Sequence, residues 1–499
     1  MKNIKEIISL MRNPTQKDID LIQKSYDFAL NAHKEHKRFS GEPYFNHLFA
    51  TAKNIAELGM SATAISAGFL HDSIEDVGVD PEEIRKEFGE EILFLVQGVA
   101  KLGQIKYKGT NRYNESLRKF FGAMSKDIRV LIIKLCDRLN NMQTLEHVPK
   151  TKQLRIAKET LEIFAPLAHR LGIKKLQRDL EDLAFTYIYP EKAEKTKNLL
   201  VKKKEEHEIH LDKFRESIIK KLYKNGITNF RIDYRVKGLY SLYKKLERYE
   251  NNIDNIYDIS ALRIIVQDIT DCYRILGIVH NSWKPLLGRI KDYIASPKPN
   301  GYRSLHTTVF SGDGSIIEVQ IRTEEMDKES EYGIASHLSY KSSASHNKSL
   351  YLVKNIISQK NIDDIRNKNS EELIDIPIWI KELVKYQEAT GNKFLEEIKK
   401  DILEERIFVF TPKGDVIDLP LGSSVIDFAY MIHTDVGNHI SGAKVNGKFV
   451  ALYTKLQNGD RVEIETKKSA KPNKKWIEHC KTALAKHQIK SAISRELKR

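Results

Sequence analysis

Six side chains that can bind a metal ion or carry a proton lie in three short segments of the N-terminal third of the sequence. They are His47 in GEPYFNH, four residues of GFLHDSIEDVG (His71, Asp72, Glu75 and Asp76), and Asp137 in IKLCDRLNN. Imidazole and carboxylate groups are common ligands of divalent metal ions, and water bound to such an ion is acidic enough to attack phosphorus near neutral pH. The set therefore predicts a hydrolytic metal centre, in which Glu75 and Asp76 orient or deprotonate the water.

The spacing of these residues suits a helix. Residues four apart share a helix face, which pairs His71 with Glu75 and Asp72 with Asp76. Asp137 follows an apolar helix face, and Asn141 comes four residues later on the same face. A lone His-Asp pair is more often a solvated helix surface than a pair of ligands. Four such elements in one helical segment favour the metal centre.

A second polar set, between residues 231 and 341, suits a polyphosphate. In RVKGLYSLYKK, Arg235 and Lys237 form a pair of cations at a strand end. Ser241 and Lys245 follow at one-turn spacing on the next helix and add a hydroxyl and a third cation. Converging cations of this kind bind phosphate oxygens. The sequence has no GxxxxGK[ST] loop, so a nucleotide site here is not of the P-loop kind.

Two carboxylates flank this set. Asp258 precedes the strand-like ALRIIVQD, and IIEVQIRT alternates so that Glu318, Gln320 and Arg322 face one side. If the two strands are neighbours, Asp258 and Glu318 can hold Mg²⁺ together with substrate phosphates. Between them, a Pro-Asn-Gly turn is expected to expose Tyr302 for base stacking, and further groups can reach phosphates, namely Lys291, Lys298, Arg303 and His306. The alternative is ordinary strands with solvated polar faces.

The elements that position these residues predict a multidomain fold. We expect an all-α domain at 1–195, a mixed α/β domain at 196–341, a helical connector at 342–403, a small β-grasp unit at 404–466 and a basic helical tail at 467–499. The β-grasp unit should contain hairpins at Lys-Gly-Asp and Asn-Gly turns and a helix with a Ser N-cap.

Composition narrows the class of protein. The chain has 499 residues, a net charge of +15 and only three scattered cysteines, and it has no membrane-length apolar run and no clear signal peptide. We therefore expect a cytoplasmic protein with no membrane partner. The segment 467–499 carries 11 Lys and Arg against two Glu, a net charge of +9. Such basic charge suits nucleic acid or anionic nucleotides.

The N-terminal motifs RFSGEPYFNH, FLHDSIEDVG, MSKDIRVLIIKLCDRLNNMQTL and APLAHRLGI resemble the HD-type hydrolase domain of the RelA/SpoT homologues, which make and degrade the alarmone (p)ppGpp in the stringent response. The resemblance implies Mn²⁺ ligands at His47, His71, Asp72 and Asp137, a water-activating pair at Glu75 and Asp76, and nucleotide contacts at Arg38 and Asn141. Phe39 and Asn140 depart from the family, which often has Lys and His there.

The motifs YRVKGLYSLYKKL, YDISALRIIV, GRIKDYIASPKPNGYRSLHTTV, EVQIRTEEM and EYGIASHLSYK resemble the family's synthetase domain. The resemblance implies transfer of pyrophosphate from ATP to the 3′-hydroxyl of GTP or GDP, with Asp258 and Glu318 binding Mg²⁺ and Glu318 near the attacking hydroxyl. Nucleotide contacts are implied at Arg235, Lys237, Ser241, Lys245, Lys291, Lys298, Asn300, Tyr302, His306, Gln320 and Arg322. The RIKD at 289–292 is the basic version found in bifunctional members.

Residues 405–466 resemble a TGS domain, which in long family members contacts the acceptor end of tRNA on the ribosome; His433 is the matching polar contact. The alternative for His433 is a helix-terminal histidine that caps carbonyl groups. The family's further C-terminal regulatory domains, including the ACT or RRM-like region, are not expected in this chain. Besides the bifunctional enzyme, two hypotheses remain: a ribosome- or tRNA-binding regulator with vestigial sites, and a hydrolase with a weak synthetase.

Overall fold

The computed structural model describes residues 2–100, 124, 126–253, 256, 259–298, 300–312, 315–338 and 406–497. The predicted helical connector at 342–403 lies outside these residues. The chain divides into two compact units, 1–106 with 126–375 and 107–125 with 376–499, and each is described by itself. Among the described residues, no helix combines the length and apolar character needed to cross a membrane.

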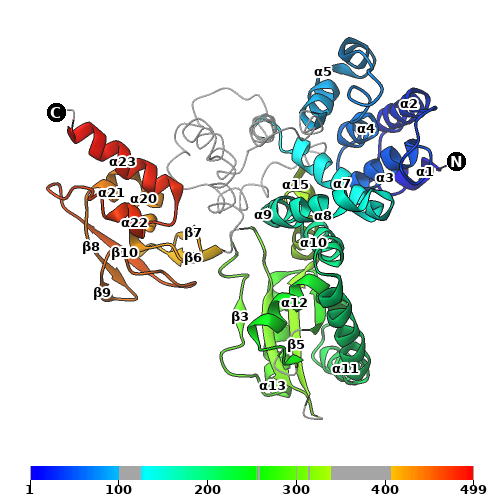
Figure 1. Ribbon diagram of the computed structural model, residues 1–499. Helices are drawn as coiled ribbons and strands as arrows, with labels where there is room; N and C mark the ends of the chain where they lie inside the picture. The colour runs from blue at the N-terminus through cyan, green and yellow to red at the C-terminus, as the bar shows by residue number, and fades with distance from the viewer. Residues whose placement is uncertain are drawn as a thin grey trace. The chain divides into compact units, whose positions relative to one another are not determined.

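In the N-terminal part of the first unit, up to Ile188, all the regular elements of the described residues are helices, as predicted (Figure 1). Its helices begin where the sequence supplies caps: Thr15 forms a capping box with Asp18, and the Ser61 hydroxyl accepts a hydrogen bond from the Ala64 amide. The elements are α1 (Lys5–Ile8), α2 (Gln16–Ala32), α3 (Phe45–Glu57), α4 (Ala62–Leu70), α5 (Pro81–Ala100), α7 (Arg129–Gln143), the short η1 (Leu145–His147), α8 (Lys150–Glu159), the π-helical η2 (Thr160–Phe164), α9 (Ala165–Arg170) and α10 (Lys174–Ile188).

Close packing of α3 on α4 depends on a glycine. A Cβ added at Gly68 would lie 2.5 Å from Ile55 Cδ1, which would have to move, and 3.3 Å from the backbone atom Ala52 Cα, which is a tight contact. Both helices carry a candidate ligand, since His47 lies in α3 and His71 caps the C-terminus of α4. The missing side chain at Gly68 thus lets the two imidazoles approach each other.

Helix α11 (Pro190–Lys224) joins the helical part to the sheet. Its C-terminal half belongs to the sheet's core, because Leu211, Phe214, Ile218 and Leu222 pack with apolar residues of the strands and of α13 (Figure 1). The expected domain boundary between residues 195 and 196 therefore falls inside a continuous helix.

The sheet has five strands in the order β1-β2-β5-β4-β3, and β2 runs parallel to β5 while the other neighbours are antiparallel. The two strands that contain ALRIIV and IIEVQIRT are therefore neighbours, as expected. The elements are β1 (Phe230–Val236), α12 (Leu239–Arg248), β2 (Ser260–Val266), α13 (Ile269–Ser282), β3 (Lys291–Asp292), β4 (Leu305–Phe310), β5 (Ile316–Thr323), α14 (Glu324–Tyr332) and α15 (Ala335–Leu338).

The second unit contains two small sheets, β6-β7 and β10-β8-β9. Both predicted hairpins are present, and Asn446 and Gly447 have the positive φ of a tight two-residue turn. Ser424 caps α20 in a capping box with Asp427, as predicted. The elements are β6 (Arg406–Phe410), β7 (Val416–Pro420), α20 (Val425–Ile432), α21 (Thr434–Asn438), β8 (Ile440–Val445), β9 (Lys448–Val450), β10 (Val462–Thr466), α22 (Trp476–His479) and α23 (Ala483–Leu497).

The basic C-terminal segment packs against α20. Cys480, Ala485 and Ile489 form a buried cluster with Ile426 and Tyr430. The buried Asp427 carboxylate accepts hydrogen bonds from the backbone amides of residues 481 and 482 and from the Thr482 hydroxyl. A negative group near the start of a helix is stabilising, so this carboxylate fixes the position where α23 begins. The segment is therefore a packed part of this unit and not only a solvated, charged tail.

Candidate metal centre and nucleotide pocket

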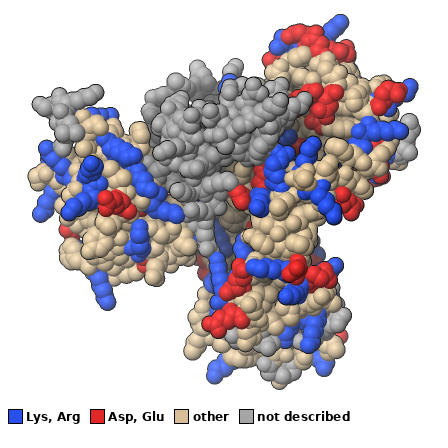
Figure 2. All heavy atoms as spheres, viewed as in Figure 1, with Lys and Arg blue, Asp and Glu red and all other residues tan. Residues whose placement is uncertain are grey.

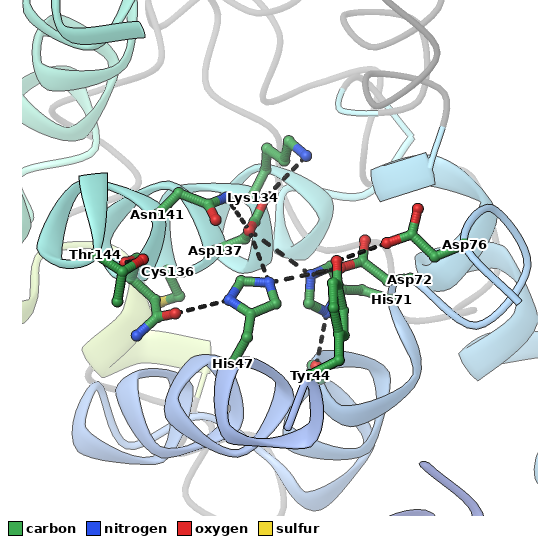
Figure 3. Close-up of polar contacts among 12 residues, drawn as sticks. Tyr44, His47, His71, Asp72, Asp76, Lys134, Cys136, Asp137, Asn141 and Thr144 are labelled. Carbon is green, nitrogen blue, oxygen red and sulfur yellow. Dashed lines mark hydrogen bonds and ion pairs between the residues drawn. The ribbon is translucent and has the colours of Figure 1, made fainter. Parts of the chain in front are cut away.

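Four side chains from three elements converge in the helical part (Figure 3). His47 Nε2 lies 3.5 Å from Asp72 Oδ2 and 3.3 Å from Asp137 Oδ1. His71 Nε2 lies 3.2 Å from the same Asp72 oxygen and 3.7 Å from the same Asp137 oxygen. Two nitrogens and two oxygens therefore face one point, and His47, His71 and Asp137 are all buried.

The outward nitrogens of both imidazoles are already held. His47 Nδ1 is 2.7 Å from the Asn140 side-chain oxygen, and His71 Nδ1 is 2.8 Å from the Gly68 carbonyl oxygen. These acceptors place the protons on Nδ1 and leave the Nε2 lone pairs facing inward, which is how ligating histidines are usually oriented. Within the described part of the chain, His71 Nε2 is buried and makes no well-aligned hydrogen bond, although the Asp72 oxygen lies 3.2 Å away. The donor set fits a divalent ion.

The electrostatics of the cluster reflect this concentration of charge. Burial alone would lower the pKa of His71, but the Asp72 and Asp137 carboxylates outweigh it and raise the pKa to about 10. Nε2 therefore carries a proton when no cation is bound, and a metal ion would displace that proton. Burial raises the pKa of Glu75 to about 7, although Lys134 opposes the shift. Glu75 thus titrates within the range useful to an acid or base near neutral pH.

The local structure of the acidic segment differs from the prediction. Helix α4 ends at Leu70, and residues 71–76 form turns rather than a helix. One bond of helical spacing survives, from the Asp76 amide to the Asp72 carbonyl oxygen at 2.9 Å. The prediction of a continuous helix through residue 76 was wrong. The helix ends at Leu70, and the turn that follows directs the His71 ring toward Asp137.

Three groups at this centre were missed in the sequence. The Tyr44 hydroxyl is 2.8 Å from Asp72 Oδ2 and 2.6 Å from Asp76 Oδ2. Lys134 Nζ lies 2.8 Å from Asp137 Oδ2, the oxygen that points away from the histidines. Asn140 contacts His47. Lys134 and Asn140 lie within one turn of Asp137 on α7, a spacing that could have indicated them.

The two expected nucleotide contacts on this side are joined by hydrogen bonds. Arg38 donates to the side-chain oxygens of Asn140 at 3.0 Å and of Asn141 at 2.6 Å. Asn141 in turn donates to Asp137 Oδ1 at 2.6 Å. Phe39 is 71% exposed, and the Lys152 ammonium lies 5.9 Å from its ring centroid. A cation is therefore present beside the position where the family often has lysine.

The second constellation surrounds a cavity of about 210 Å³ on the sheet. Strand register places Arg235 opposite Ala261, Ala261 opposite Glu318, and Glu318 opposite Thr308. Residues in one row of a sheet share a face, and the small Ala261 leaves room above it. The predicted residues that line the cavity are Arg235, Lys237, Lys245, Lys291, Lys298, His306, Glu318 and Gln320.

Hydrogen bonds connect several of these side chains. Tyr302 Oη is 2.7 Å from His306 Nε2, and His306 Nδ1 is 3.0 Å from Glu318 Oε1. Gln320 donates to the same Glu318 oxygen at 3.0 Å, and Arg235 donates to the Gln320 oxygen at 3.2 Å. Burial lowers the pKa of His306, so the neutral ring accepts from Tyr302 and donates to Glu318.

Tyr302 is not exposed, contrary to the prediction. Only 4% of it is accessible, because the Lys174 ammonium of α10 lies 3.1 Å from the ring centroid and donates to the Ser330 hydroxyl at 3.1 Å. The backbones meet here too, since a Cβ at Gly172 would lie 2.9 Å from the Asn300 carbonyl oxygen. A base can stack on Tyr302 only after Lys174 leaves the ring.

The remaining predicted residues lie elsewhere. Arg322 is 1% exposed and pairs with Asp327 of α14 at 2.6 Å, so its side chain serves the fold in this structure. Ser241, Asn300, Tyr302 and Arg322 are absent from the described lining of the cavity. Asp258 lies outside the described residues. Six lining residues were not predicted as contacts: Tyr249, Ile256, Ala261, Arg289, Tyr293 and Thr308.

In the second unit, His433 is exposed between α20 and α21. Its Nδ1 accepts a hydrogen bond from the Asp435 amide at 3.2 Å. It therefore caps an N-terminal amide of α21, whereas the alternative expectation was a cap on carbonyl groups.

Comparison with known proteins finds family matches for three parts of the chain. Residues 25–174 match a model of the HD domain, residues 234–345 match the region found in RelA/SpoT proteins, and residues 407–466 match the TGS domain. The chain belongs to the RelA/SpoT family. All six residues of the first set fall within the HD domain, and the sheet cavity falls within the RelA/SpoT region.

Curated relatives of this RelA/SpoT homologue are named for (p)ppGpp hydrolysis, for pyrophosphate transfer to GTP, or for both. A guanosine-3′,5′-bis(diphosphate) 3′-pyrophosphohydrolase of Aquifex aeolicus is 42% identical over 95% of this chain and 65% of that protein. A GTP pyrophosphokinase of Myxococcus xanthus is 41% identical over 96% and 61%. A bifunctional (p)ppGpp synthase/hydrolase of Mycobacterium tuberculosis is 41% identical over 96% and 63%. The chain spans less than two thirds of each of these relatives.

Proposed function

We propose that this RelA/SpoT homologue is a bifunctional enzyme that hydrolyses the 3′-pyrophosphate of (p)ppGpp at the metal centre and makes (p)ppGpp at the sheet cavity. The observation that carries the proposal is the presence of two polar constellations in separate folded parts of one chain. Relatives named for hydrolysis and for pyrophosphate transfer support it. ATP and guanine nucleotides as substrates support a cytoplasmic location.

The test is a pair of incubations of the full chain. With ppGpp and Mn²⁺, the products should be GDP and pyrophosphate; with ATP, GDP or GTP, and Mg²⁺, they should be ppGpp or pppGpp and AMP. Chromatography separates these nucleotides. Absence of both conversions would favour the alternative of a ribosome- or tRNA-binding regulator with vestigial sites. That alternative is disfavoured by the buried His47, His71 and Asp137, since buried charge is costly unless it serves a purpose.

In the proposed hydrolysis, His47, His71, Asp72 and Asp137 would hold the ion, which we infer to be Mn²⁺. When bound, it supplies a Lewis acid that makes water a nucleophile near neutral pH. One carboxylate of the Glu75 and Asp76 pair takes a proton from the water as the water oxygen forms a bond to the 3′-phosphorus. The bond from phosphorus to the 3′-oxygen breaks, pyrophosphate leaves, and the same carboxyl group returns its proton to the 3′-oxygen. Arg38 and Asn141 hold the nucleotide.

In the proposed synthesis, Glu318 accepts the proton of the 3′-hydroxyl of GDP or GTP. The 3′-oxygen forms a bond to the β-phosphorus of ATP, and the bond to the α-phosphate oxygen breaks to release AMP. Asp258 and Glu318 would hold Mg²⁺, which neutralises phosphate charge. The phosphates are met by Arg235, Lys237, Ser241, Lys245, Lys291 and Lys298, with Asn300, Tyr302, His306 and Gln320 on the acceptor side. Arg322 is buried and paired with Asp327, so it is not part of this set.

A pH dependence of nucleotide binding follows from Lys298. Burial lowers its pKa to about 8, and Lys291 and Arg235 add to the depression while Glu318 opposes it. A lowered lysine pKa means that the charge is present below pH 8 and is lost as the pH rises through it. Affinity for Mg²⁺-ATP, measured by calorimetry, should fall by at most about tenfold per pH unit above that point, since one proton is linked.

The variant Lys298→Arg tests whether Lys298, and not another titrating side chain, causes this pH dependence. The guanidinium stays charged throughout, so the variant should lose the decline in affinity. The exposed Lys284→Arg is the matched control and should keep it. A decline that persists in Lys298→Arg would assign the pH dependence to a different residue.

The second unit supports a proposal of RNA binding. Blue side chains predominate over red ones on the face of this unit seen in Figure 2. We infer that the TGS domain, through His433 and its neighbours, and the basic C-terminal segment bind tRNA, alone or on the ribosome. Removal of the segment after Thr466 would also uncover the apolar cluster of Ile426 and Tyr430, so charge reversal is the cleaner test.

The double variant Lys474→Glu/Lys475→Glu reverses two exposed charges. It should weaken tRNA binding, measured by filter retention at several salt concentrations. Each lost phosphate contact should flatten the slope of log affinity against log salt by about 0.7 for single-stranded contacts. Lys220→Glu/Lys221→Glu, another adjacent exposed pair, is the control. Equal slopes in all three proteins would contradict an RNA surface here.

A further inference from the structure

The Tyr44 hydroxyl stands between the two acidic residues of the hydrolase centre. It lies 2.8 Å from Oδ2 of Asp72, an expected metal ligand, and 2.6 Å from Oδ2 of Asp76, an expected proton carrier. Figure 3 shows the phenol directed at this pair from α3. Within the described part of the chain, Tyr44 is the only side chain that donates a hydrogen bond to the Asp76 carboxylate.

The ring that carries this hydroxyl is held from several sides. The Tyr44 amide donates to the His36 carbonyl oxygen at 2.9 Å, which closes a short loop before α3. The ring stacks on His33 with centroids 5.1 Å apart and planes 11° apart, and it meets the edge of His47 at 5.6 Å. A ring packed in this way has few rotamers open to it, so the hydroxyl position is fixed before substrate arrives.

The proton count shows what the hydroxyl can do. A phenol is protonated at neutral pH and has one hydrogen to donate. The same Asp72 oxygen faces both imidazoles, at 3.2 Å from His71 and 3.5 Å from His47, so this oxygen is the one available to a metal ion. Once it is engaged there, the Tyr44 proton is directed to Asp76. Asp76 is otherwise an exposed side chain on a turn and would sample several positions.

We propose that Tyr44 is a positioning residue of the hydrolase centre, whose hydroxyl holds the Asp76 carboxylate beside the metal ligand Asp72. The inference rests on the proposed hydrolase function and adds a residue to it. Tyr44 acts through Asp76 and does not itself take the proton of the water. Groups of this kind, one layer out from the ligands, typically change activity or metal affinity by about 10- to 100-fold when removed.

Tyr44→Phe tests the proposal because it removes one oxygen and keeps the ring stacked on His33. With ppGpp and Mn²⁺, kcat should fall about 10- to 100-fold while KM stays within about twofold. Mn²⁺ affinity, measured by calorimetry without nucleotide, should stay within about threefold. Tyr26→Phe is the matched control. Tyr26 is buried in the same helical part, and its hydroxyl donates to the Lys2 carbonyl oxygen; kcat should be unchanged.

A double variant shows whether Tyr44 works through Asp76. If it does, Tyr44→Phe/Asp76→Asn should be no slower than Asp76→Asn alone, because the hydrogen bond has lost its purpose. Fully multiplicative losses would overturn the proposal, as would an unchanged kcat in Tyr44→Phe. A loss of Mn²⁺ affinity that matches the loss of rate would also overturn it, since Tyr44 would then support only Asp72. A wild-type protein that binds Mn²⁺ but leaves ppGpp intact would overturn the hydrolase function itself.

Discussion

Replacing His71 by asparagine is expected to abolish Mn²⁺ binding and, with it, the release of pyrophosphate from ppGpp. The His71 ring contributes a buried Nε2 that makes no well-aligned hydrogen bond within the described part of the chain and is aimed at the point where the Asp72 and Asp137 oxygens meet. Loss of this ligand leaves three groups, and the remaining carboxylates repel each other without a cation between them. Calorimetry reports the binding, and chromatography of the nucleotides reports the hydrolysis.

A contrasting variant separates metal loss from loss of the proton carrier. Asp76→Asn should keep Mn²⁺ bound but slow hydrolysis by about 10²- to 10⁴-fold, the usual contribution of a general acid or base. Mn²⁺ should also raise the melting temperature of the wild type and of Asp76→Asn, because an ion that binds only the folded state stabilises it. It should not do so for His71→Asn. Full hydrolysis in a chelated sample would contradict the metal centre.

Glu318→Gln is expected to remove pyrophosphate transfer while leaving hydrolysis of ppGpp intact. The carboxylate lines the sheet cavity and accepts hydrogen bonds from His306 and Gln320. In the proposed synthesis it receives the proton of the acceptor hydroxyl. The amide has nearly the same shape, but it can neither take that proton nor bind Mg²⁺ as a charged ligand. Incubation with ATP, GDP and Mg²⁺ measures the loss.

The exposed Glu325→Gln, on α14, is the control for this change and should keep both activities. The two activities should separate because Glu318 lies on the sheet and the metal centre lies among helices α3, α4 and α7. A folded Glu318→Gln protein that lost hydrolysis as well would contradict the division into two sites.

Several features of the fold could be predicted because they depend on neighbours in the sequence. Alternation in IIEVQIRT puts Ile317, Val319 and Ile321 into the core, and the structure confirms this. Asn446-Gly447 makes a hairpin because both residues accept positive φ. Ser424 caps α20 through its own hydroxyl. Each of these follows from the conformational preferences of a few adjacent residues.

Other predictions failed where distant parts of the chain meet. Tyr302 belongs to a turn of the kind that usually lies at the surface, yet Lys174 covers it from a helix 128 positions earlier in the sequence. A helix was predicted through residues 71–76, but these residues form a turn. In this turn the His71 ring packs beside His47 and faces Asp137. The basic segment 467–499 has a weak helical pattern, but Asp427 and the apolar side of α20 give its last helix a fixed start and a buried face.

The sequence by itself determined which chemistry is available: the histidines, carboxylates and cations, and their distribution between a helical part and a sheet. Only the tertiary structure decided which atoms meet. The hydroxyl of Tyr44 reaches Asp72 across 28 positions, Arg38 reaches Asn140 across 102, and Lys174 reaches Ser330 across 156. The physical reason is the distance along the chain over which each kind of interaction acts. Backbone periodicity relates residues within a turn or a strand, whereas contacts of this length depend on how closely whole elements pack, and at Gly68 that packing is set by a side chain that is absent.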